Sequence, residues 1–172
     1  MVVATRGLVA KLLKTDSKTI AITIQRMIFF AKGVLETVKK LNWSPDIIHL
    51  HGSFNALLPL YLKMLYGEDP IFLNTKIVSS IYEKSFEGQL SKSMAKKIQF
   101  DGIEKGLDKI SSPSYDALID LMLEFSDSVI LSSDKIEKST EKIIKNSSKP
   151  ALSYKDSLDE SLLMNFFSKI LD

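Results

Sequence analysis

Short apolar runs alternate with helix-periodic segments along most of the chain. Residues Asp46–His51, Lys76–Tyr82 and Ser128–Ser132 have the length and the apolar character of buried strands. The segments that follow repeat apolar residues at helical spacing, as in the helix predicted over Asn55–Tyr66. Strands and helices in alternation predict an α/β fold with a parallel sheet.

The two ends of the chain are less regular. Thr19–Ile24 alternates and predicts a strand, whereas a helix is expected from Gln25 to Lys40. Ser112-Pro113 predicts the start of a helix with proline at its first position. Ser157-Leu-Asp-Glu160 has the pattern of a capping box, which predicts a terminal helix. Its buried side is expected to hold Leu162, Leu163, Phe166, Phe167, Ile170 and Leu171. Three strands make a thin sheet, so we expect an incomplete Rossmann-like parallel sheet with flanking helices.

The candidate chemistry lies after the strand that ends at His51. In parallel α/β sheets, ligands bind outside the carboxyl ends of the strands. Gly52 and Asn55 belong to the loop that follows His51, and Tyr82 and Glu83 end the next strand, so all could line one cleft. Free N–H groups after Gly52 could hold a phosphate or a hydroxyl group. Alternatively, Gly52 only makes the turn and Ser53 caps the helix, while Tyr82 and Glu83 form an exposed loop.

Two histidines, His49 and His51, are the only ones in the chain and lie two residues apart on one strand. Both therefore point to one face of the strand. A metal site would need at least one more ligand, and no side chain stands at a useful spacing, so we expect none. His49 is interpreted as a core histidine bonded to the backbone. For His51, a role at the ligand edge and a structural role in the turn both remain open.

Composition narrows the function classes only slightly. Apolar residues make up 45% of the 172 residues, and the net charge is +2, with lysines interspersed among acids. This pattern is that of a solvated face and argues against nucleic-acid binding. There are no cysteines, which excludes disulfides and a cysteine nucleophile and fits a cytoplasmic protein. No apolar run approaches the roughly 20 residues of a membrane span, and no secretion signal is expected.

Two motifs resemble the starch/glycogen synthase family. Pro45–Leu62 is similar to that family's Pro-Asp-hydrophobic-hydrophobic-His-x-His-Asp-Trp-His segment, which precedes a helix with Leu-x-Pro-x-Tyr-Leu. Ser80–Gly88 is similar to its Thr-hydrophobic-His-Asn-Leu-Ala-Tyr-Gln-Gly segment, in the same order and spacing. Phe29–Lys40 and Ala95–Ile103 resemble the short glycogen-synthase-like proteins of the Bacteroidetes type.

The resemblance implies the N-terminal half of a GT-B glycosyltransferase fold over residues 26–172, with residues 1–25 unassigned. That family transfers glucose from ADP-glucose to an α-1,4-glucan with retention, and it needs neither metal nor cofactor. The partners implied are a nucleotide sugar and an α-glucan. The residues expected to bind substrate are His51, Gly52, Asn55, Tyr82 and Glu83, and no catalytic residue is assigned.

Three departures from the family pattern shape the functional hypothesis. Residues 1–25 hold no Lys-x-Gly-Gly-like donor loop, so we expect a chain that is truncated at its N-terminus. The second GT-B domain, which supplies most donor contacts, is not expected either. Gly52-Ser53-Phe54 replaces Asp-Trp-His, so Phe54 stands where the family has a sugar-contacting histidine, and Tyr82-Glu83 replaces His-Asn. We therefore expect a chain inactive alone; the alternative is a non-catalytic glucan-binding or regulatory partner of another glycosyltransferase chain.

Overall fold

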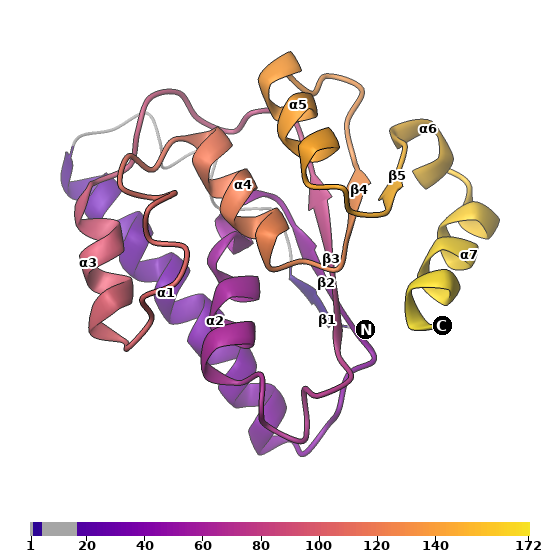
Figure 1. The fold of residues 1–172 in the computed structure, drawn as a ribbon, viewed down its shortest axis with the longest axis horizontal. Helices are drawn as coiled ribbons and strands as arrows, with labels where there is room; N and C mark the ends of the chain where they lie inside the picture. The colour runs from indigo at the N-terminus through magenta and orange to yellow at the C-terminus, as the bar shows by residue number, and fades with distance from the viewer. Residues whose placement is uncertain (1, 5–16) are drawn as a thin grey trace.

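The computed structural model of the protein describes residues 2–4 and 17–172, with side chains from Thr23 onward. Its centre is a parallel sheet of five strands in the order β1-β2-β3-β4-β5 (Figure 1). The strands are β1 (Val2–Ala4), β2 (Ile47–His51), β3 (Lys76–Ile81), β4 (Ser128–Leu131) and β5 (Ala151–Leu152). The predicted α/β class and the three inner strands are confirmed. The three-strand count was wrong, because β1 and β5 are too short to show a period of two.

Seven α-helices and one short 3-10 helix surround the sheet in the described part of the chain. They are α1 (Ser17–Lys40), η1 (Ser53–Asn55), α2 (Leu57–Leu65), α3 (Ser93–Phe100), α4 (Tyr115–Glu124), α5 (Lys138–Asn146), α6 (Tyr154–Ser157) and α7 (Glu160–Leu171). Helices α1, α2 and α4 pack on one face of the sheet around the main core, and α7 lies on the other face (Figure 1). No described helix has both the length and the apolar character needed to cross a membrane.

Helix α1 corrects the prediction of a strand at Thr19–Ile24. That segment lies inside α1. The alternation misled because Ile24 also belongs to a helical series, and the members of that series are all buried: Ile24, Met27, Ala31, Leu35 and Val38. Asn42, with φ of 48°, ends the helix. The amides of Asn42 and Trp43 donate to the carbonyls of Lys39 and Val38, which is the Schellman pattern.

Two helix starts also differ from the prediction. Helix α4 begins at Tyr115 rather than at Pro113, because the Ser114 hydroxyl accepts the amide of Ala117 and caps the helix. Helix α7 is capped by Asp159, whose carboxylate accepts the amides of Ser161 and Leu162. The predicted capping box was therefore wrong, and Ser157 instead ends α6.

The buried side of α7 is narrower than predicted. Phe167 is buried against Ile47, Val78, Ile130 and Leu152 in a small second core. Leu163, Phe166 and Ile170 are half-buried around it, whereas Leu162 and Leu171 are exposed. Among the described helices, α7 is the one whose side chains form this second core, and the residues that flank Phe167 remain in contact with solvent.

Candidate functional site

The carboxyl ends of β2 and β3 bring two of the predicted site residues together. The strands pair in parallel with His51 opposite Ser80, which places Tyr82 just beyond the end of β3. The Nδ1 atom of His51 and the phenol oxygen of Tyr82 share a hydrogen bond of 2.8 Å. Both side chains are half-buried. An imidazole and a phenol therefore stand side by side at the sheet edge, where each can also hydrogen-bond to a polar ligand.

His49 forms the inner wall of this site. It is buried, and its ring lies 4.1 Å from that of His51, as expected for two residues on one face of β2. Its Nε2 atom shares a 2.8 Å hydrogen bond with the Ser80 hydroxyl, so the predicted backbone partner was wrong. Burial, helped by the neighbouring His51, lowers the pKa of His49 to about 4. His49 is therefore neutral near pH 7 and keeps its hydrogen bond to Ser80.

The glycine turn after His51 is tied to the neighbouring strand. Gly52 has φ of 79°, and its amide donates to the Ser80 carbonyl over 3.0 Å. A side chain would be strained at this φ, which explains the glycine. The Ser53 hydroxyl does not cap a helix; it is hydrogen-bonded to the Ser85 hydroxyl at 2.8 Å. That bond joins the β2 loop to the loop after β3.

Asn55 and Phe54 support the site from beneath. The Nδ2 atom of Asn55 donates to the His51 carbonyl over 2.8 Å, and its Oδ1 atom is buried without a hydrogen-bond partner among the described residues. Asn55 thus fastens η1 to the end of β2 from a buried position. Phe54 is half-buried, with its ring 5.7 Å from that of Phe30 on α1. Its phenyl ring offers none of the hydrogen bonds that a histidine could provide there.

Glu83 directly follows Tyr82 in the loop after β3. Its side chain is exposed. The next residue, Lys84, pairs with Glu87 at 2.8 Å and with Glu137 at 3.5 Å, which anchors this loop. The Tyr115 hydroxyl donates to the Tyr82 carbonyl over 2.8 Å and fixes the loop from α4. In the described part of the chain, no group of three or more His, Asp or Glu side chains is arranged to hold a metal.

Four supporting residues were missed by the sequence reasoning: Ser80, Ser85, Tyr115 and Phe167. Ser80 could have been found, since parallel pairing of the two predicted strands sets it opposite His51. Tyr115 and Phe167 come from α4 and α7. Phe167 presents its ring edge-on to His49 at 5.5 Å. No local pattern indicates these long-range contacts.

Comparison with known families shows to which family the chain belongs. The sequence model of the starch synthase catalytic domain matches residues 12–146. The chain belongs to the starch synthase catalytic domain family. The suspected family resemblance is thereby confirmed, whereas the division of the chain at residue 26 stays a prediction.

Curated relatives in this family are bacterial glycogen synthases. The glycogen synthase of Chlorobium chlorochromatii (strain CaD3) is 36% identical over 86 residues, which are 50% of this chain and 18% of the relative. That of Clostridium perfringens (strain 13 / Type A) is 40% identical over 67 residues, or 39% of this chain and 14% of the relative. The glycogen synthase of Geotalea uraniireducens (strain Rf4) is 32% identical over 112 residues, which are 65% of this chain and 22% of the relative. The chain therefore spans less than a quarter of each of these relatives.

A solved structure supports the fold. The catalytic domain of starch synthase IV from Arabidopsis thaliana, bound to ADP and acarbose, superposes with a TM-score of 0.60 at 17% identity. The match covers 79% of this chain and 31% of that domain. The parallel sheet with its flanking helices is thus part of a GT-B glycosyltransferase fold, as predicted.

Proposed function

We propose that this chain forms one wall of a glucosyl-transfer cleft whose substrates are ADP-glucose and an α-1,4-glucan. The observation that carries the proposal is the His51–Tyr82 pair at the carboxyl ends of β2 and β3 in a starch synthase family chain. In open parallel sheets this edge is where ligands bind. The relatives are named glycogen synthases, and the structural neighbour was solved with ADP and acarbose, which agrees with these substrate classes.

The site residues divide into contact and support roles in this proposal. His51 and Tyr82 hydrogen-bond to sugar hydroxyl groups, and the exposed Glu83 carboxylate accepts further hydroxyl groups. Gly52 lets the ligand approach the backbone, because it carries no side chain beside Tyr82. Asn55 is buried and holds the end of β2 in place.

Glycogen binding is the direct test of the contact roles. We expect the chain to co-sediment with glycogen, and His51→Ala and Tyr82→Phe each to weaken binding by roughly tenfold, the effect of one lost hydrogen bond. The matched control is Tyr66→Phe, just after α2 and at the opposite end of that helix from the loop that follows His51. If wild type does not co-sediment with glycogen, the binding function is refuted. Equal binding by all four proteins would show that glucan binds elsewhere.

We further propose that the chain by itself does not turn over ADP-glucose. Retaining transfer requires donor and acceptor to be held in line and developing charge to be stabilised, which one wall of a cleft does not achieve. Phe54, packed against Phe30, supports this, because it stands where the family pattern has a histidine. Incorporation of labelled glucose from ADP-glucose into glycogen by the purified chain would contradict this proposal.

The same observation on Phe54 favours a second candidate, a non-catalytic glucan-binding or regulatory partner of another glycosyltransferase chain. Under this alternative, glycogen co-sediments without turnover. Added chain should then change the rate of an active glycogen synthase, and His51→Ala should abolish that change. If a saturating concentration of the chain leaves the rate of the glycogen synthase unchanged, the regulatory role is refuted.

A further inference from the structure

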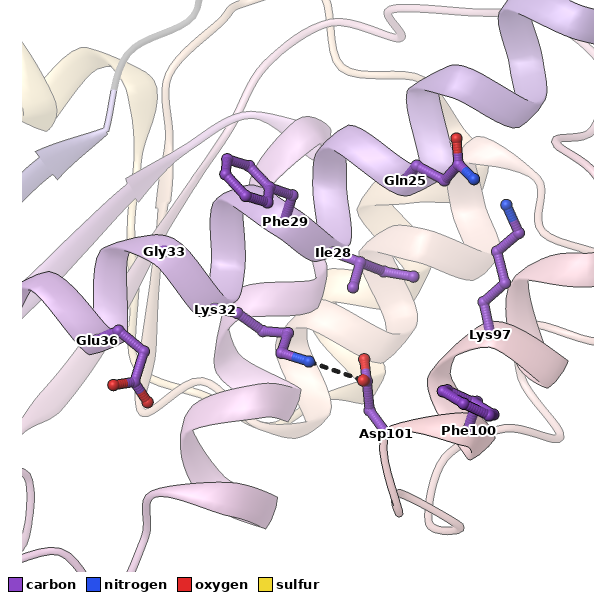
Figure 2. A pocket seen from close by; sticks show the side chains of 9 residues that line it. All are labelled: Gln25, Ile28, Phe29, Lys32, Gly33, Glu36, Lys97, Phe100 and Asp101. Atoms are coloured by element: carbon purple, nitrogen blue, oxygen red, sulfur yellow. Dashed lines mark hydrogen bonds and ion pairs between the residues drawn. The ribbon is translucent and has the colours of Figure 1, made fainter.

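A hollow of about 540 Å³ lies between α1 and α3 (Figure 2). The surface exposed inside it is mainly apolar, although charged residues also line it. Phe29 on α1 is 80% exposed and Phe100 on α3 is 93% exposed. Two phenylalanines so open to water are costly to leave uncovered, and aromatic side chains of this kind are enriched at protein interfaces.

The base of the hollow contains a glycine, Gly33, and therefore no side chain at that position. Gly33 lies in the middle of α1, and a Cβ atom at this position would meet nothing within 4 Å. Glycine inside a helix costs about 0.5–1 kcal/mol relative to alanine, and no contact among the described residues requires a glycine here. The surface thus combines protruding rings with a depression that can accept a ring.

Two positive and two negative side chains line the hollow, and the unlike charges at its two ends are separated from each other. Figure 2 shows Glu36 at one end, Lys97 at the other, and the bonded pair Lys32–Asp101 between them. The Lys32 ammonium lies 2.7 Å from Asp101, whose second oxygen accepts the Tyr61 hydroxyl over 2.6 Å. Lys97 makes no ion pair within the described residues. A patch with an anion at one end and a cation at the other complements its own copy when rotated by 180°.

We propose that this surface is the interface of a two-fold symmetric dimer, so that its occupant is a second copy of the chain. The two-fold operation places the same patch on both sides, as isologous contacts require. Phe100 of one copy enters the hollow of the other above Gly33, and Lys97 of each copy meets Glu36 of its partner. The net charge of +2 opposes association only weakly. The proposal does not depend on the glucosyltransferase function.

Sedimentation equilibrium of the full chain tests the dimer. We expect wild type to reach twice the monomer mass, and Gly33→Trp and Phe100→Asp to raise the dissociation constant at least about 30-fold, a loss of roughly 2 kcal/mol, typical of an interface hot spot. Lys40→Trp, at an exposed position of α1 outside the hollow, is the matched control and should remain dimeric. A wild-type chain that stays monomeric up to about 0.5 mM, corresponding to only about −4.5 kcal/mol of association, overturns the proposal. If the wild type is such a monomer and binds glycogen, and Gly33→Trp does not bind glycogen, the hollow would be a sugar-binding site instead.

Charge exchange tests the two-fold arrangement itself. Lys97→Glu alone sets two carboxylates against each other at each contact, and Glu36→Lys alone sets two ammonium groups together, so each variant should be monomeric. Mixing the two variants restores opposite charges at both contacts, and a 1:1 heterodimer should form. Urea unfolding of each variant checks that it is folded, because Glu36 also accepts the Tyr66 hydroxyl. Two folded variants that fail to associate on mixing overturn the two-fold register.

Discussion

At the residue scale, His49 couples the site to the acid stability of the whole chain. Its pKa is about 4 in the folded protein, chiefly because it is buried, against about 6.5 in the unfolded chain. Between these values the unfolded chain binds more protons, so the free energy of unfolding rises with pH from about 4 to 6.5 and is level above. One pKa unit corresponds to about 1.4 kcal/mol, so acidification through this window should remove roughly 3 kcal/mol.

Urea unfolding at pH 4.5 and pH 7 of wild type and His49→Asn measures this contribution. Carboxylates also titrate at the lower pH, but they are common to both proteins, so the difference isolates His49. We expect the variant to lose less stability on acidification than wild type. Because the chain has two histidines, their NMR resonances give the two pKa values directly. A His49 pKa near 6.5 would refute the explanation.

At the element scale, sequence patterns predicted those helices and strands whose formation depends on residues close in the sequence. The inner strands were found because their apolar runs are buried on both faces, and parallel pairing then placed His51 beside Tyr82. Thr19–Ile24 was mistaken for a strand because apolar and polar residues alternate over these six residues. The segment is the start of α1, and the helical spacing of apolar residues becomes clear only further along the helix. Strand β5 is two residues long and depends on its pairing with β4. The contact of Phe167 with His49 depends on how α7 docks, which no local sequence signal encodes.

The end of α2 gives a prediction at the same scale. A Cβ atom at Gly67 would lie 2.8 Å from the Lys63 carbonyl oxygen, and the backbone cannot move aside cheaply. We expect Gly67→Ala to destabilise the protein by about 1–3 kcal/mol, the usual cost of overpacking. Gly33→Ala is the matched control, since its added methyl group meets nothing within 4 Å and removes a helix-interior glycine. That substitution should stabilise the chain by up to about 1 kcal/mol. Equal effects of the two substitutions in urea unfolding would contradict the steric argument.

On the scale of the whole molecule, the two faces of the sheet are unequally covered. One face carries the main core, to which α2 contributes a continuous run of buried residues, Leu57–Leu62. The other face is closed by α7, where Phe167 is the single buried side chain of the helix. Local stability follows the density of buried apolar contacts. Helix α7 should therefore open without global unfolding, and each opening should expose His49 behind Phe167.

Native-state hydrogen exchange tests this uneven stability. We expect amides of Glu160–Leu171 to be at least about tenfold less protected than those of Leu57–Leu65, because α7 opens locally whereas α2 is released only by global unfolding. Phe167→Ala should lower protection in α7 further and raise the pKa of His49, since water then reaches the imidazole ring. The control is Phe166→Ala, which removes a half-buried neighbour without a ring contact to His49 among those described. Equal protection of the two helices, together with an unchanged His49 pKa in Phe167→Ala, would show that α7 is an integral part of the main cooperative unit and that the site does not sense its docking.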